Sequence, residues 1–291
     1  MALRSGGLDR RGYKQGHDDG DHNDAGCDLP ATLPDGRPIA VLKFGGSVLA
    51  GTASLGDVAR CVGAWRDRGF AVVAVVSALA GRTDALAGLC AGARDPWAAA
   101  GVLALGEAES AARSAMACCE AGLRVTSASP GAFGMVCDGP PTDATPTGFA
   151  SGRFRVLLGR HDAVVVPGYT GIDAFGRPVV LGRGGSDLTA LFLASVLDAG
   201  RCVLLKDVDG LYDRDPACSG ASRYARASFA QALATDGTIV QHKAVRFAAS
   251  RGLAFDLGSI EGGEPTRIGE AVQIGEAAAA TTAGRARLIA G

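Results

Sequence analysis

The sequence predicts an α/β fold with a mainly parallel central sheet covered by helices. Short apolar runs rich in β-branched residues alternate along the chain with segments of helical periodicity, which is typical of successive βαβ units. Most of these runs are followed by Gly, Ser or Pro, as buried strands are where they enter functional loops. The chain has 291 residues, a length that fits one large α/β domain or two small ones.

Five apolar runs are expected to be buried strands of this sheet. They cover residues 39–43, 70–76, 162–166, 201–205 and 253–257. Because parallel strands end at one common edge, the loops that follow these runs are expected to form the functional site.

Four segments are expected to be helices that cover the sheet. They cover residues 54–68, 98–121, 188–197 and 243–250. The first begins with Ser54 and Asp57, a near match to a capping box, and continues with apolar residues at helical spacing. Residues 126–152 are rich in Pro, Gly, Thr and Ser, and are expected to be a loop or small hairpin that shapes a substrate site.

Charge and composition exclude several classes of protein. The chain has 29 Lys and Arg against 30 Asp and Glu, so there is no electrostatic basis for broad binding of nucleic acid or of an anionic membrane. Gly, Pro or charged residues interrupt every apolar run well before about 18 residues, so we expect a soluble protein without a membrane span. The eight cysteines include no C-x-x-C motif and are expected to be reduced packing residues.

Residues 1–36 are polar and contain no stretch like the apolar core of a secretory signal. We therefore expect a disordered leader on a cytoplasmic protein. The His and Asp side chains within residues 17–22 could instead chelate a metal ion, although a flexible segment loses conformational entropy on binding.

Glycine is about twice as frequent as in an average protein, with 43 residues. The first glycine cluster follows the run 39–43 and contains Lys43, Gly45, Gly46 and Ser47. Adjacent glycines let backbone N–H groups converge, and a lysine adds a compact cation, which together suit a polyphosphate. Since the sequence has neither the Walker spacing nor the dinucleotide glycine fingerprint, a plain Gly-Gly turn is the alternative.

The second glycine cluster, residues 182–187, opens an expected helix, and a glycine-rich loop at a helix N-terminus is an anion site. Arg183 could bind a carboxylate through two hydrogen bonds, and Asp187 could order a lysine or a metal ion. The alternative is a structural ion pair between Arg183 and Asp187.

The third cluster, residues 206–216, follows the run 201–205 and is dense in acidic residues. An EF-hand loop starting at Asp207 would have Tyr212 where glycine is required and Cys218 where the bidentate glutamate is required. Calcium binding is therefore not expected.

Five stretches, in this order, resemble the amino acid kinase superfamily and most closely the catalytic domain of the aspartate kinases. They are residues 41–47, 75–84, 105–107, 181–187 and 206–216. The resemblance covers about residues 38–270 and implies a three-layer αβα sandwich of the amino acid kinase and carbamate kinase type. It also implies one catalytic domain at 37–291, with an acceptor-binding lobe at about 37–180 and a nucleotide-binding lobe at about 181–291.

For an aspartate kinase, the implied activity is the ATP-dependent phosphorylation of the β-carboxylate of L-aspartate to 4-phospho-L-aspartate, as in amino-acid biosynthesis. The substrate carboxylate is already a nucleophile, so no general base is required, which explains the lack of a His or Cys constellation. The resemblance further implies ATP and Mg²⁺, no dedicated metal site on the protein, and a homodimer formed through the kinase domain.

By position, Lys43 corresponds to the family lysine that stabilises the transferring phosphoryl group, and Asp187 to the aspartate that organises lysines around the phosphates. The implied ATP-binding residues are Lys43, Gly45, Gly46, Ser47, Lys206, Asp207, Asp209, Gly210 and Tyr212. The implied acceptor-binding residues are Ser77, Thr83, Glu107, Arg183, Gly184, Gly185 and Ser186. Of these, Arg183 would bind a carboxylate of the amino acid, Glu107 its α-ammonium group, and Thr83 would donate a hydrogen bond.

Two of these residues also have simpler interpretations. Glu107 could be an ordinary surface residue of an Ala-rich helix. Thr83 could cap a helix that begins near Asp84. His161 and His242 are expected to be structural.

The sequence departs from the aspartate kinase pattern on the nucleotide side. The region that reads G-A-K-V-L-H-P in that family is residues 237–243 here, so Ile239 stands where a nucleotide-orienting lysine is expected. Lys243 could reach back to replace that cation. Ala217 also stands where the family usually has a basic residue beside the nucleotide. These losses suggest altered nucleotide affinity, a different donor or reduced activity.

The chain ends shortly after the kinase-like region, so the paired ACT domains of aspartate kinases are not expected. This favours an enzyme of a specialised pathway. The alternatives to aspartate are another small amino acid or carboxylate acceptor in secondary metabolism. A non-catalytic subunit that senses nucleotides or amino acids is the alternative from a different class.

Overall fold

The computed structural model describes residues 32–51, 53–215 and 218–270, and its centre is an eight-stranded sheet with the order β10-β12-β11-β9-β1-β2-β6-β3. The strands are β1 (Ile39–Phe44), β2 (Ala71–Val76), β3 (Val125–Ser127), β6 (Ala163–Pro167), β9 (Arg201–Lys206), β10 (Arg226–Ser228), β11 (Phe255–Ser259) and β12 (Thr266–Gly269). Every neighbouring pair is parallel except β11 with β12, which confirms the predicted mainly parallel sheet.

Alternate residues of the central strands enter two hydrophobic cores, one on each face of the sheet. In β1, Ile39 and Val41 belong to one core, whereas Ala40 and Leu42 belong to the other. Successive side chains of a strand point to opposite faces, so a strand buried on both faces needs apolar residues at every position. This explains the uninterrupted apolar runs of the sequence.

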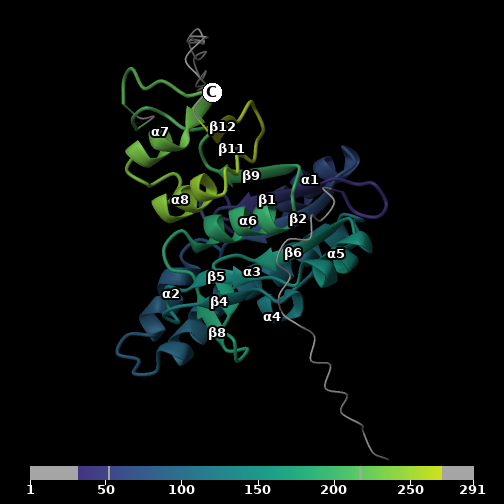
Figure 1. Cartoon of the computed structure of the whole chain (residues 1–291), viewed down its shortest axis with the longest axis vertical. Coiled ribbons are helices and arrows are strands. Elements are labelled where there is room, and N and C mark those ends of the chain that lie inside the picture. Colours follow the sequence, from purple (N-terminus) through teal and green to yellow (C-terminus); the bar gives the residue numbers. More distant parts are fainter. Residues whose placement is uncertain (1–31, 52, 216–217, 271–291) are drawn as a thin grey trace, which may run out of the picture.

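Helices cover both faces of the sheet, which confirms the three-layer αβα sandwich. One core is closed by α1 (Ser54–Asp67) and α3 (Pro96–Glu120). The other is closed by α5 (Ser151–Gly159), α6 (Gly185–Val196), α7 (Phe229–Ala234) and α8 (His242–Ser250). Figure 1 shows α6 lying over β1 and β2, which are among the strands that it contacts. No helix of the described residues is long and apolar enough to cross a membrane.

A smaller sheet has the strand order β5-β4-β7-β8. Its strands are β4 (Val136–Asp138), β5 (Thr145–Gly148), β7 (Thr170–Ile172) and β8 (Pro178–Val180), and the nearby short helices are α2 (Arg82–Leu89) and α4 (Pro130–Phe133). Figure 1 shows β4, β5 and β8 at the opposite end of the molecule from α7, β11 and β12. The expected hairpin within residues 126–152 is present, because β4 and β5 pair antiparallel.

Three sequence predictions need correction. The capping box at Ser54 is wrong: the N-cap is Ala53, and the Ser54 hydroxyl donates to the Gly51 carbonyl. The strand expected at 253–257 begins two residues later because the Leu253 N–H bonds to Ala248 at the end of α8. The helix expected at 188–197 begins three residues earlier, at Gly185.

The expected leader, residues 1–36, is described only from residue 32, so the possible metal chelation within residues 17–22 lies outside the described residues. The part that is described is not disordered. Leu33 is buried in the core, and the Arg155 guanidinium donates to the Thr32 carbonyl. The structured domain therefore begins before the predicted boundary.

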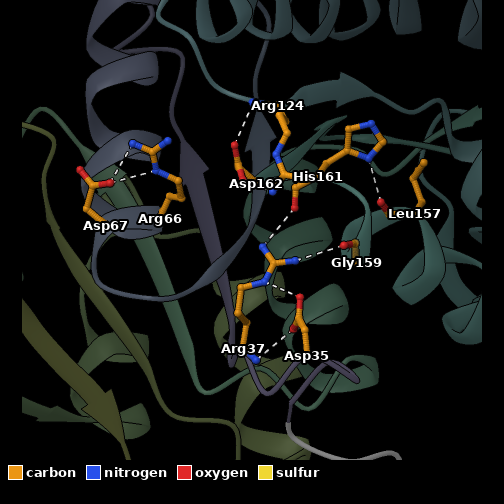
Figure 2. Close-up of polar contacts among 9 residues, drawn as sticks. All are labelled: Asp35, Arg37, Arg66, Asp67, Arg124, Leu157, Gly159, His161 and Asp162. Atoms are coloured by element: carbon orange, nitrogen blue, oxygen red, sulfur yellow. Dashed lines mark hydrogen bonds and ion pairs between the residues drawn. The ribbon is translucent and has the colours of Figure 1, made fainter.

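Polar contacts cross-link the amino edge of the sheet (Figure 2). Arg37, which precedes β1, pairs with Asp35 and donates to the Gly159 and His161 carbonyls at the end of α5, where a cation is favourable for the helix dipole. Arg124 donates to Asp162 at 2.7 Å. The amino ends of β1, β3 and β6 are thereby tied together, at the edge opposite the loops described next.

Candidate active site

The loops after β1, β2, β6 and β9 lie together at the carboxyl edge of the sheet, because these four strands are parallel. Backbone hydrogen bonds fix them to one another. The Gly45 N–H donates to the Leu205 carbonyl at 3.1 Å, and the Ser77 N–H donates to the Phe44 carbonyl at 3.1 Å. The Gly168 N–H donates to the Val76 carbonyl at 2.9 Å. The expectation that the strand-end loops meet is confirmed.

Two lysines and one aspartate form a buried cluster at this edge. The Lys43 ammonium lies 2.7 Å from Asp187 Oδ1, and the Lys206 ammonium lies 3.1 and 3.0 Å from the two Asp187 oxygens. The side chains of Lys43 and Asp187 are 5% and 3% exposed. Lys43 is at the end of β1, Lys206 at the end of β9, and Asp187 in the first turn of α6.

The electrostatics of this cluster follow from burial and mutual charge. Burial lowers the pKa of Lys43 to about 8, with Asp187 opposing this shift and Lys206 adding to it. Burial acts to raise the pKa of Asp187, but the two ammonium groups outweigh it and hold that pKa below its usual range. Asp187 therefore stays ionised and holds two cations that otherwise repel each other.

Gly45 lets the backbone approach both lysines. A Cβ atom there would lie 3.3 Å from Lys43 Nζ and 3.4 Å from Lys206 Cδ. Gly46 is next to the Ala78 carbonyl, and Ser47 is exposed to solvent. Gly45 thus leaves room beside the two ammonium groups, which a plain Gly-Gly turn would not require.

The Gly182–Ser186 segment is a tight loop that leads into α6 and includes its first two residues. Gly182 and Gly184 have φ values of +69° and +77°, in the left-handed region that favours glycine. Arg183 is exposed and makes no ion pair with any described residue, so the alternative of an Arg183–Asp187 pair is wrong. Its guanidinium is free to bind a ligand.

Glu107 is buried on α3, and the alternative of a surface glutamate is wrong. The residue is 3% exposed, and its Oε1 accepts from the Ala78 N–H at 3.3 Å. Its Oε2 has no hydrogen-bond partner among the described residues. Burial raises the pKa of Glu107 to about 7. Gly106 permits this approach, since a Cβ there would lie 3.0 Å from that of Ala78.

Thr83 lies in the first turn of α2, whose N-cap is Gly81 with no side-chain cap, so Thr83 does not cap this helix. Its side chain is exposed. Ser77 is half-buried in the loop after β2, one residue before the N–H that binds Glu107.

The loop after β9 is held by a contact within it and by Arg223 and Thr266 from later in the chain. The Tyr212 hydroxyl donates to Asp209 at 2.8 Å, and Arg223 lies 3.7 Å from the same carboxylate. Gly210 packs on Thr266, whose hydroxyl accepts from the Leu211 N–H. Asp207 is exposed, and Ala217 lies outside the described residues.

Sequence reasoning missed Tyr169 and Thr189. Tyr169 follows β6 with a φ of +64°, and its N–H donates to the Thr189 hydroxyl, which in turn donates to the Gly185 carbonyl. Burial, and then the charges of Glu107 and Asp143, raise the pKa of Tyr169 to about 12. Gly168 and Tyr169 come just after Pro167, which follows the expected strand 162–166, so the strand-end criterion would have found them.

The position expected to hold a nucleotide-orienting lysine is apolar. Ile239 is half-buried and packs against the core closed by α6 and α8. Lys243 does not replace it in this structure, because its three donors bind Asp143 Oδ1 at 2.7 Å, the Ala144 carbonyl at 3.2 Å and the Leu181 carbonyl at 2.9 Å.

Together, an αβα sandwich and a lysine–aspartate–lysine cluster at its carboxyl edge are features of the amino acid kinase class. Comparison with known sequences agrees: residues 38–254 match the model of the amino acid kinase family, and the chain belongs to that family.

Similar sequences and structures carry the name aspartokinase or aspartate kinase. The aspartokinase of Pseudomonas aeruginosa is 32% identical over 217 residues, which are 72% of this chain and 53% of that protein. The aspartokinase of Bacillus sp. (strain MGA3) is 33% identical over 242 residues, or 80% of this chain and 59% of that protein. The chain thus spans about half the length of the curated relatives it matches.

Among solved structures, aspartate kinase from Synechocystis is 26% identical with a TM-score of 0.66, over 80% of this chain and 40% of that chain. E. coli aspartokinase III in complex with aspartate and ADP has a TM-score of 0.71 at 23% identity, over 81% of this chain and 65% of that chain. At 23% identity, the similarity to E. coli aspartokinase III shows the fold alone.

Proposed function

We propose that the chain catalyses ATP-dependent phosphorylation of the β-carboxylate of L-aspartate, giving 4-phospho-L-aspartate. The observation that carries this proposal is the buried Lys43–Asp187–Lys206 cluster beside Gly45. Phosphoryl transfer needs positioned positive charge where the transferring group and the leaving oxygen gain negative charge. Two ammonium groups held by one carboxylate supply that charge without reorganisation during the reaction.

The reaction requires no residue of the protein to act as a base. A carboxylate oxygen of the acceptor forms a bond to the γ-phosphorus of ATP, and the bond from that phosphorus to the β,γ-bridging oxygen breaks. ADP leaves with the bond's electron pair. Because the acceptor attacks as its anion, no proton has to be removed from it, and Lys43 and Lys206 act through charge and position.

The acceptor would lie between Glu107 and the Gly182–Ser186 loop. The unpartnered Glu107 Oε2 suits an α-ammonium group, and the exposed Arg183 guanidinium suits a carboxylate. Ser77 and Thr83 would add hydrogen bonds, while Gly184, Gly185 and Ser186 would line the acceptor site. One acidic and one basic side chain therefore suit the ammonium group and one carboxylate of an α-amino dicarboxylate, whose other carboxylate is phosphorylated.

The nucleotide would use the loops after β1 and β9. Gly45, Gly46 and Ser47 would cradle the phosphates. The further residues proposed to contact the nucleotide are Lys206, Asp207, Asp209, Gly210 and Tyr212. The described residues contain no group of three or more metal-ligating side chains, and both Asp187 oxygens are bonded to lysines. Mg²⁺ would therefore be held mainly by ATP phosphate oxygens, where it neutralises charge.

We also propose a division into an acceptor-binding part at about 37–180 and a nucleotide-binding part at about 181–291. The domain is proposed to act in the cytoplasm as a homodimer. Light scattering of the purified chain across a concentration series tests the dimer, and a monomer at every concentration contradicts it.

A second candidate is a non-catalytic subunit that binds nucleotide or amino acid. The apolar Ile239 favours it, because a phosphate-facing cation is missing on the nucleotide side. The intact Lys43–Asp187–Lys206 cluster favours catalysis.

One experiment separates these candidates. The purified chain is incubated with MgATP and a panel of amino acids and small carboxylates, and acyl phosphate is trapped with hydroxylamine. We expect hydroxamate and ADP with L-aspartate. Product with another carboxylate but not with aspartate reassigns the acceptor. Absence of hydroxamate and of ADP with every acceptor, while ligand binding persists, supports the sensing subunit.

A further inference from the structure

Lys243 joins three parts of the chain that are distant in sequence. It lies in the first turn of α8, and its ammonium group binds the Asp143 carboxylate, the Ala144 carbonyl and the Leu181 carbonyl. Asp143 and Ala144 precede β5 of the small sheet, and Leu181 follows β8 and opens the Gly182–Ser186 loop. One side chain thus connects α8 to the small sheet and to that loop.

A lysine at the position of Lys243 would destabilise the start of α8 if these contacts did not compensate. The N-terminal turn of a helix carries partial positive charge, so a lysine there is unfavourable by itself. Three oxygen acceptors around one ammonium group compensate, and they use all three of its donors.

Lysine is also scarce in this chain. Its basic residues are almost all arginine, and the lysines are Lys14, Lys43, Lys206 and Lys243. A compact ammonium group can bind three oxygens that converge on one point, whereas the planar guanidinium fork of arginine cannot do so equally well.

The glycines of the loop show that it is clamped from both sides. At Gly182, a Cβ would lie against the Asp143 carboxylate, with Oδ1 at only 2.2 Å. At Gly184, it would lie 2.3 Å from Cβ of Gln241, the N-cap residue of α8. The loop therefore fits between Asp143 on one side and the start of α8 on the other.

We propose that Lys243 is a positioning residue that clamps the Gly182–Ser186 loop between Asp143 and α8, and thereby holds Arg183 in its acceptor-binding position. Lys243 itself touches neither acceptor nor phosphate in this assignment. It acts by fixing the Leu181 carbonyl, one residue before the loop. The kinetic consequence rests on the proposed function, whereas the structural consequence does not.

The test compares Lys243→Met with Arg246→Met. Arg246 is on the same helix, is exposed and makes no hydrogen bond or ion pair with a described residue, so the control removes the same charge without a clamp. Hydrogen exchange of the amides in segments 141–144 and 180–186 is measured by mass spectrometry. These segments include the Val180 N–H bonded to Pro141 and the Gly185 N–H bonded to Gly182.

We expect Lys243→Met to speed exchange in both segments at least about fivefold, with Arg246→Met unchanged. If Lys243→Met does not fold, Asp143→Ala removes the side-chain acceptor and is expected to speed exchange in the same segments. Unchanged exchange in a folded clamp variant, or the same increase in Arg246→Met, overturns the proposal.

Steady-state kinetics give a second test, because a purely structural role would not change the acceptor KM and the ATP KM differently. In Lys243→Met, the acceptor KM is expected to rise about five- to tenfold while the ATP KM changes less than about twofold. An equal rise in both KM values, or in neither, overturns the positioning role. If the unmodified chain phosphorylates no acceptor, the proposed function fails, and the exchange measurement alone still decides whether the clamp exists.

Discussion

The ammonium nitrogen of Lys43 lies 2.7 Å from the carboxylate of Asp187, and both side chains are almost completely buried. Lys206 shares the same carboxylate from the neighbouring strand β9. Three sequence-distant residues therefore form one charged unit at the carboxyl edge of the sheet. Its net charge is positive, which is the charge needed beside a polyphosphate.

Replacing Lys43 by Met is expected to lower kcat about 1,000-fold, because the variant loses a positioned cation at the transferring phosphoryl group. The thermal midpoint is expected to change little, since Lys206 still pairs with Asp187 and a buried ammonium is itself costly. Steady-state kinetics and thermal unfolding measure both. A Lys43→Met variant with more than a tenth of the original kcat contradicts the assignment.

The kcat/KM for the acceptor is expected to be bell-shaped in pH. Glu107, with a pKa of about 7, must lose its proton to bind an ammonium group, so the value rises through that pH. Lys43, with a pKa of about 8, must keep its proton, so the value falls at higher pH. Initial rates at subsaturating acceptor between pH 5.5 and about 9.5 measure the profile. A flat profile rules out both assignments.

Replacing Glu107 by Gln is expected to stabilise the fold at high pH. The pKa of this carboxyl is raised from 4.5 to about 7 in the folded state, so the stability it contributes is present at low pH and is lost as pH rises toward 7. That loss reaches about 3 kcal/mol above pH 7.

The measurement is the thermal midpoint of Glu107→Gln relative to the original chain at pH 5 and at pH 8. We expect the difference to favour the variant by several degrees more at pH 8 than at pH 5. Glu120→Gln, exposed on the same helix, is the control and should show no such change. An identical difference at the two pH values contradicts a buried carboxyl group with a raised pKa.

Replacing Arg183 by Ala is expected to raise the acceptor KM about 10- to 100-fold, through loss of a charge-assisted hydrogen-bonded pair with a carboxylate. Stability should not change, because the side chain is exposed and has no ion-pair partner among the described residues. Arg153→Ala, at an exposed site on α5, is the matched control. A parallel rise in the ATP KM would instead mark Arg183 as a phosphate contact.

Introducing a lysine at Ile239 is expected to lower the ATP KM about three- to tenfold, because it restores a cation on the nucleotide side. The side chain is only half-buried, so a lysine stem can pack on the core while its ammonium reaches solvent. Ile239→Met keeps the apolar packing and is the control. An unchanged ATP KM in folded Ile239→Lys would show that the position does not face the nucleotide.

The sequence by itself determined the central strands and the residues at their carboxyl ends. An uninterrupted apolar run is a local signal of a strand buried on both faces, and glycines after such runs mark where the backbone must approach something closely. For this reason Lys43 and Asp187 could be selected from the residues alone, whereas the role of Lys206 came from the resemblance to the family. The helices 54–68, 98–121 and 243–250 follow equally from local periodicity.

Only the tertiary structure decided how those side chains are paired. Arg183 and Asp187 are close in sequence, yet Asp187 pairs with Lys43 and Lys206, because α6 directs its first turn at the ends of β1 and β9. Glu107 looks like a surface residue of an Ala-rich helix, and its burial arises from the loop after β2 packing on Gly106. Lys243 likewise finds its acceptors about 60 to 100 positions away in the chain. Charge pairing and burial depend on contacts between distant segments, and local sequence patterns carry no information on such contacts.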